Sequence, residues 1–105
     1  MMLLTTAVYP PHMAQKVGET YINIMDKYPD DSSIAEPLIP AAVSSTLKGI
    51  NVISIYLIKD GKLKEAMDLA SSRMLEFGKI QGFRYSIETV YDASEAMALL
   101  GLEAP

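Results

Sequence analysis

The side chains able to do acid–base chemistry are few, and no two of them form a familiar motif. His12 is the only histidine in the 105 residues, and histidine alone has an ordinary pKa near neutrality. It follows Pro10 and Pro11, where a strand is expected to give way to a helix. There it could act as a general base or as a single axial haem ligand. It could equally be a solvated histidine in the first turn of the helix.

A second pair of candidates lies near the end of the chain. Arg84 and Glu88 are four residues apart in an expected strand over residues 83–91, so both point to the same face of a sheet. Arg84 could hold a ligand carboxylate and Glu88 could act as a base. The alternative is a solvated charged stripe that protects an edge strand from pairing.

Tyrosine supplies the remaining candidates, since the chain has six tyrosines and no tryptophan. Tyr56 lies in an apolar run that we interpret as a central strand, and Tyr9 ends its expected neighbour. Tyrosine hydroxyls can orient a quinone or a fatty acid in an apolar cavity, and Tyr56 is also a candidate catalytic residue. Ser54 is a polar position in the same strand. Alternatively, the tyrosines fill a dimer interface, where this residue type is enriched.

Several kinds of site are excluded by composition. The absence of cysteine removes disulfides, thiolate metal sites and cysteine nucleophiles. A single histidine makes a histidine-rich metal site improbable, and there is no phosphate-binding glycine loop or nucleophile elbow. We therefore expect no metal and no cofactor. The net charge of −4 argues against nucleic acid as a partner.

The helices and strands that position these residues can be predicted from the spacing of apolar residues and from the prolines and glycines that interrupt regular structure. Apolar residues at steps of three and four predict amphipathic helices after Pro11 and after Gly61, with Arg73 assigned to the polar side of the second helix. Asp92 to Glu95 has the form of a capping box for a short third helix. Runs rich in β-branched and aromatic residues predict four strands, over residues 3–9, 41–47, 50–58 and 83–91.

The order of these elements is β-α-β-β-α-β with a short C-terminal helix. This order predicts a single α+β domain over residues 1–105, a ferredoxin-like sandwich with two helices on one face of a four-stranded antiparallel sheet. The expected strand order is 4-1-3-2. It places the second strand at an edge, as Pro37 and Pro40 require because proline cannot donate a ladder hydrogen bond.

Two helices cover only one face of such a sheet, yet the strands are apolar on both faces. The third strand presents Ile53, Ile55 and Leu57 to one face and Ile50, Val52, Tyr56 and Ile58 to the other. An apolar face of this kind exceeds what monomers usually expose. We expect a second copy to cover it, giving a homodimer packed sheet to sheet. The alternatives are that the third helix folds back over the face or that another protein covers it.

With its element order and two-sided strands, the chain from Leu3 to Leu100 resembles the dimeric α+β barrel superfamily. The resemblance implies paired ferredoxin-like sheets and a ligand cleft between helices and sheet. Members include cofactor-free monooxygenases, haem-handling enzymes, isomerases and ligand-binding regulators, so the fold does not choose an activity.

The sequence thus supports a small homodimer that binds an apolar or carboxylate ligand between sheet and helices. The ligand-binding candidates are Tyr9, Ser54, Tyr56, Arg84 and Glu88. The alternative is a cofactor-free monooxygenase or isomerase, and the residues leave open whether the protein is an enzyme. No apolar run reaches the roughly 20 residues that span a membrane, and no signal peptide is apparent. We therefore expect a cytoplasmic protein.

Overall fold

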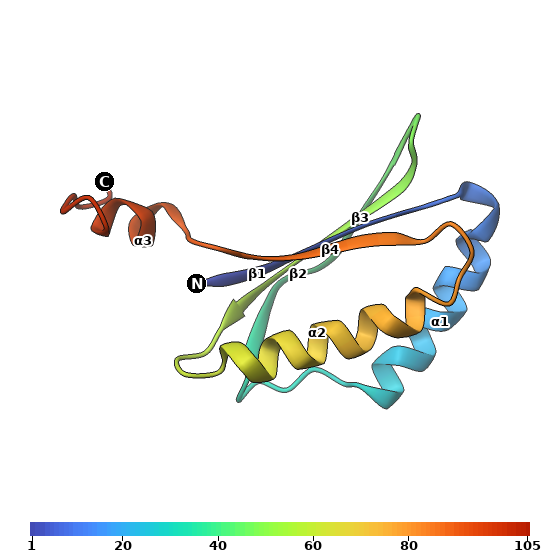
Figure 1. The fold of residues 1–105 in the computed structure, drawn as a ribbon, viewed down its shortest axis with the longest axis horizontal. Coiled ribbons are helices and arrows are strands. Elements are labelled where there is room, and N and C mark those ends of the chain that lie inside the picture. Colours follow the sequence, from blue (N-terminus) through green and yellow to red (C-terminus); the bar gives the residue numbers. More distant parts are fainter.

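The computed structural model describes residues 1–105 and shows an α+β fold with four strands and three helices (Figure 1). A single 3-10 turn, η1 (Pro11–Met13), leads into the first helix. The strands and helices, in chain order, are β1 (Met2–Tyr9), α1 (Ala14–Lys27), β2 (Ala35–Thr46), β3 (Gly49–Ile58), α2 (Leu63–Phe77), β4 (Arg84–Val90) and α3 (Ala93–Ala98).

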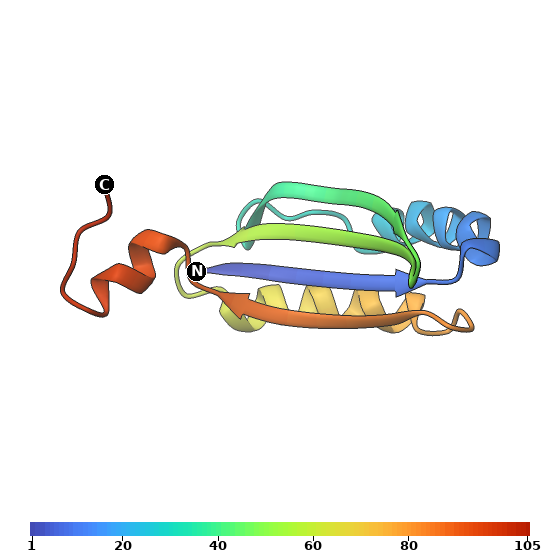
Figure 2. The same ribbon diagram turned by 90° about the horizontal axis from the view of Figure 1, so that it is seen from above.

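The four strands form one open antiparallel sheet in the order β2-β3-β1-β4. Read from the other edge, this is the strand order expected from the sequence. Both α1 and α2 lie on the same face of the sheet, while the opposite face carries no helix (Figures 1 and 2). The predicted α+β class and the antiparallel four-stranded sheet are therefore confirmed.

The edge strand β2 differs most from expectation. It begins at Ala35, six residues before the predicted start at Ala41, and includes both Pro37 and Pro40. The register against β3 shifts twice, between Pro37 and Ile39 and between Ile39 and Ala42. Such bulges, together with the edge position, accommodate residues that cannot donate a ladder hydrogen bond. The prediction of an edge strand is confirmed, whereas its predicted start was wrong.

Alternation along the strands separates the two faces of the sheet. In β1 the odd-numbered residues are buried beneath the helices and the even-numbered residues are only half-buried. The register pairs Leu3 with Tyr56 and Thr5 with Ser54, so these four side chains share the helix-covered face. We call the opposite face the open face; its central residues are Met2, Leu4, Thr6 and Val8 of β1 and Asn51, Ile53, Ile55 and Leu57 of β3.

The hydrophobic core on the helix-covered face is divided into two clusters. One contains Tyr9, Val17, Ile24, Phe77 and Ile80 at the end of the sheet where β1 meets α1. The other contains Leu3, Ile58 and Ala66 at the opposite end. Side chains from both clusters line one cavity, so the interior is not filled continuously between them.

The last helix lies outside this arrangement. The capping box predicted for α3 is present, because the Asp92 carboxylate accepts from the Glu95 N–H at 2.7 Å while the Glu95 carboxylate accepts from the Asp92 N–H at 3.1 Å. Figures 1 and 2 show α3 projecting away from the end of the sheet, so it does not fold back over the open face. None of the three helices combines the length and apolar character that crossing a bilayer requires.

Candidate ligand cavity

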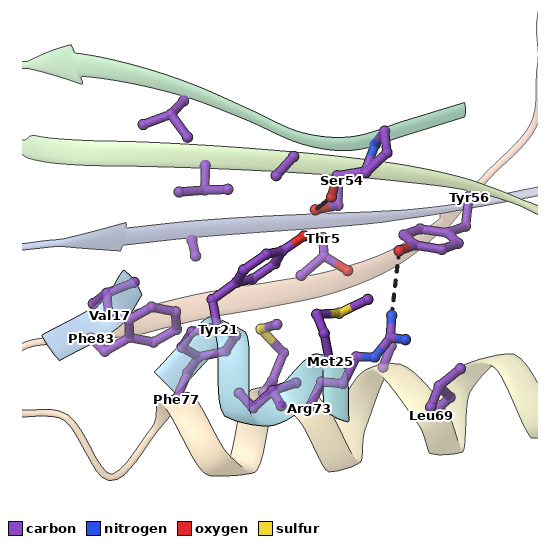
Figure 3. Close-up of a pocket in the computed structure, with 18 of the residues that line it drawn as sticks. Thr5, Val17, Tyr21, Met25, Ser54, Tyr56, Leu69, Arg73, Phe77 and Phe83 are labelled. Carbon is purple, nitrogen blue, oxygen red and sulfur yellow. Dashed lines mark hydrogen bonds between the residues drawn. The ribbon is translucent and has the colours of Figure 1, made fainter. Parts of the chain in front are cut away.

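An apolar cavity of about 310 Å³ lies between the sheet and the two long helices (Figure 3). Nineteen of its 24 lining residues are hydrophobic. Cavities that take small molecules usually occupy about 300–1,000 Å³ and are mostly apolar, with a few placed polar groups. The cavity therefore has the size and the lining of a small-molecule site.

The floor of the cavity consists of alternate residues from the two central strands. β1 contributes Leu3, Thr5, Ala7 and Tyr9, and β3 contributes Val52, Ser54 and Tyr56. Because the side-chain period of a strand is two, all of these side chains face the helices together. The exposed edge strand β2 adds Pro40, Ala41 and Val43 along one side.

The helices provide the wall opposite the sheet. Val17, Tyr21 and Ile24 follow each other at steps of four and three on α1, and Ala66, Ala70, Met74 and Phe77 do so on α2. This spacing places each set on one face of its helix. The apolar stripes that predict the helices are therefore also the surfaces that enclose the cavity.

Arg73 forms the polar end of the cavity. It is only 8% exposed, and its guanidinium donates to the Tyr28 carbonyl from Nε at 3.0 Å and from Nη2 at 2.6 Å. Nη2 also donates to Asp30 Oδ1 at 3.0 Å, and Nη1 donates to the Tyr56 hydroxyl at 3.3 Å. Arg73 thus joins α2 to the C-terminal end of α1, where a cation is favoured by the helix dipole.

Tyr56 is tied into the same cluster. Its hydroxyl donates to Asp30 Oδ1 at 3.0 Å while it accepts from Arg73 (Figure 3 shows the contact with Arg73). Burial raises the pKa of Tyr56, and the hydrogen bond to Asp30 raises it further. The phenol therefore keeps its proton at neutral pH, and it acts here as a positioned hydroxyl rather than as a base.

Three hydroxyl groups lining the cavity, those of Thr5, Tyr9 and Tyr21, have no hydrogen-bond partner within the chain. Thr5, at the centre of the floor, is 9% exposed, Tyr9 at one end of the floor is 7% exposed, and Tyr21 on α1 is 40% exposed. The ring of Tyr21 extends from α1 so that its hydroxyl points toward the sheet (Figure 3). By contrast, Ser54 Oγ donates to the Pro40 carbonyl at 2.8 Å.

The structure brings some of the sequence candidates together and separates others. Tyr9, Ser54 and Tyr56 all line the cavity. His12 is exposed in η1 and does not line it. Arg84 pairs with Val8 and Glu88 with Leu4 in the β1–β4 register, which places both on the open face, away from the cavity.

Sequence reasoning missed the three most informative polar residues of the site. Arg73 was assigned to the polar side of α2, and this was wrong: it is buried. Its spacing of three from Ala70 and seven from Ala66 does place it on the apolar stripe. Thr5 alternates with Leu3 and Ala7 and, like Ser54, could have been found as a polar position in an otherwise apolar strand. Tyr21 is one of the residues at steps of three and four that predict α1, and this spacing alone gives it no functional role.

No protein-family model matches the chain, and no curated protein matches it. No group of three or more histidine, aspartate or glutamate side chains lies close enough together to hold a metal ion.

Proposed function

We propose that this protein binds a small, mainly apolar ligand in the cavity between the sheet and the two long helices. The observation that carries the proposal is the 310 Å³ cavity with 19 hydrophobic lining residues and one buried polar cluster at its end. Apolar atoms placed there would leave water and would contact side chains of both core clusters. The hydrophobic effect and dispersion would both favour that transfer.

Binding of naphthalene, followed by amide chemical shifts or calorimetry, tests this proposal. Ala70 on α2 lines the cavity, so Ala70→Phe should fill the space and reduce naphthalene binding at least tenfold. Ala70→Leu is a milder variant for the case in which phenylalanine disturbs folding. Leu75 is on the same helix but 65% exposed, and Leu75→Phe should leave binding unchanged. Equal binding by the cavity and surface variants would refute the proposal.

We further propose that the fold is the ferredoxin-like sandwich. We also propose that two copies of the chain pair through their open faces. The structure exposes 6,844 Å², whereas a compact folded monomer of 11.5 kDa exposes about 5,800 Å². The excess of roughly 1,000 Å², to which the projecting α3 contributes, compares with about 800 Å² per partner in a stable interface. The radius of gyration, 15.1 Å, also exceeds the roughly 13 Å expected of a compact chain of this length.

The charges on the open face support pairing with a second copy. Arg84 and Glu88 lie two residues to either side of Ser86 on β4, and all three point to the open face. A two-fold axis crossing the strands at Ser86 would set Arg84 of each copy against Glu88 of the other. The apolar residues of β1 and β3 would then meet each other in the centre, so the face is self-complementary in both charge and hydrophobicity.

A further inference from the structure

We propose that the ligand is a neutral, mainly apolar molecule with a hydroxyl or carbonyl group that hydrogen-bonds to Thr5 and Tyr21, and that it is not a carboxylate. This inference rests on the proposed binding function of the cavity. It narrows the expectation from the sequence, which allowed either an apolar or a carboxylate ligand.

The charge balance of the cavity disfavours a carboxylate. Arg73 is the only charged side chain among the lining residues, and its charge is already balanced by Asp30 at 3.0 Å. Four of its five N–H groups donate to the Tyr28 carbonyl, Asp30 and Tyr56. A ligand anion would therefore lose its hydration without finding an uncompensated cation, which is costly in apolar surroundings.

The free hydroxyls define the polar group that the cavity can accept. Thr5 is 9% exposed and its hydroxyl has no hydrogen-bond partner in the chain, whereas every fully buried side-chain oxygen and nitrogen of the structure has one; the Thr5 hydroxyl is therefore accessible from the cavity, where a ligand can reach it. Ser54 and Tyr56 differ, because their hydroxyls are already used by protein groups. A ligand hydroxyl or carbonyl near Thr5 and Tyr21 would provide the missing partner, since each side-chain hydroxyl can both donate and accept.

The position of Thr5 places this polar group near the middle of the cavity floor. Toward one end of β1 the lining continues to Leu3, and toward the other to Ala7 and Tyr9. At the latter end, Phe83 stacks with Phe77 at 5.0 Å between ring centroids and with Tyr9 at 6.0 Å. A row of parallel rings packs well against another flat ring, so this end favours an aromatic portion of the ligand.

Three probes that share one ring system test the inference: naphthalene, 2-naphthol and 2-naphthoate. They are measured by calorimetry at pH 7, where the naphthol is neutral and the naphthoate is ionised. We expect 2-naphthol to bind about tenfold more tightly than naphthalene, as one or two hydrogen bonds allow. We expect 2-naphthoate to bind most weakly. Thr5→Val and Tyr21→Phe should each reduce the advantage of naphthol over naphthalene, and Thr5→Ser should retain it.

Thr6→Val is the matched control, because Thr6 adjoins Thr5 in β1 but points to the open face. It should leave all three affinities unchanged. Binding of naphthoate as tight as that of naphthol would overturn the inference while leaving the cavity as a binding site. Equal affinities for naphthol and naphthalene would likewise overturn the inference and leave the cavity as a binding site. Failure of all three probes to bind would overturn the proposed function together with the inference.

Discussion

Replacing Ile55 with lysine should separate the proposed dimer into monomers. Ile55 lies on the open face next to Ile53, which the axis through Ser86 would cross, and it is opposite Leu4 of β1 on one side and Ile39 of β2 on the other. Under two-fold symmetry a single substitution changes the interface twice. Each copy then loses an apolar contact and places an ammonium group against the apolar surface of its partner.

The size of the effect follows from the burial of the side chain. Fully burying an isoleucine contributes about 1.5–3 kcal/mol, but Ile55 is already half-buried in a single copy, so at most about a third of that gain remains and the two lost contacts remove about 1–2 kcal/mol from the association free energy. At about 1.4 kcal/mol per factor of ten, the lost contacts of Ile55→Lys should weaken dimerisation by about 5- to 30-fold. Desolvation of the two ammonium groups adds to this loss.

Sedimentation equilibrium over a range of protein concentrations measures the change directly. The wild-type chain should sediment at twice its monomer mass and Ile55→Lys at the monomer mass, with unchanged circular dichroism. Ile22→Lys makes the same chemical change on α1, where Ile22 is 65% exposed, and should remain dimeric. A monomeric wild type, or an Ile55→Lys variant that stays dimeric, would refute the reasoning.

Three further substitutions probe contacts within a single copy of the chain. Arg73→Met should lower the free energy of unfolding by about 2–3 kcal/mol, measured by urea denaturation, because the charged hydrogen bonds to the Tyr28 carbonyl are lost. An unchanged midpoint would contradict that role. Glu76 bonds two lysines, which hold its pKa below the ordinary 4.5. Its stabilisation is therefore present above pH 4.5 and is lost as the pH falls through the lowered pKa. The difference in melting temperature between the wild type and Glu76→Gln should accordingly shrink under acid, and a constant difference would exclude this linkage. Gly49→Ala should cost about 1–3 kcal/mol, because Gly49 has φ +127° and an added Cβ would lie 2.6 Å from the Tyr9 carbonyl oxygen. Equal melting temperatures would show that the turn relaxes without strain.

Much of the fold could be predicted because the local structure that the sequence patterns favour is the same as the structure that the folded protein requires. The capping box at Asp92 is a local feature that the structure confirms. The start of β2 could not be found in the same way. Pro37 and Pro40 normally interrupt strands, and they are tolerated here only because β2 is an edge strand with two register shifts. That context comes from the assembled sheet and not from neighbouring residues.

The cavity was only partly predictable for a related reason. Alternation showed that Arg84 and Glu88 share a face, and the register confirms this. It could not show which face the helices cover. The burial of Arg73 was not predicted, for a different reason: a charged side chain on a helix is normally solvent-exposed. Its burial depends on a carbonyl and a carboxylate that follow α1, more than 40 residues away in the chain.

The most direct test of the central claim is to locate bound 2-naphthol in the isotope-labelled protein by intermolecular nuclear Overhauser effects. The proposed site predicts contacts from the naphthol ring to the methyl groups of Thr5, Ala7 and Val52 on the floor of the cavity. Contacts to Leu4 and Ile55 would instead place the ligand on the open face, and they would contradict the claim that the cavity between sheet and helices is the binding site.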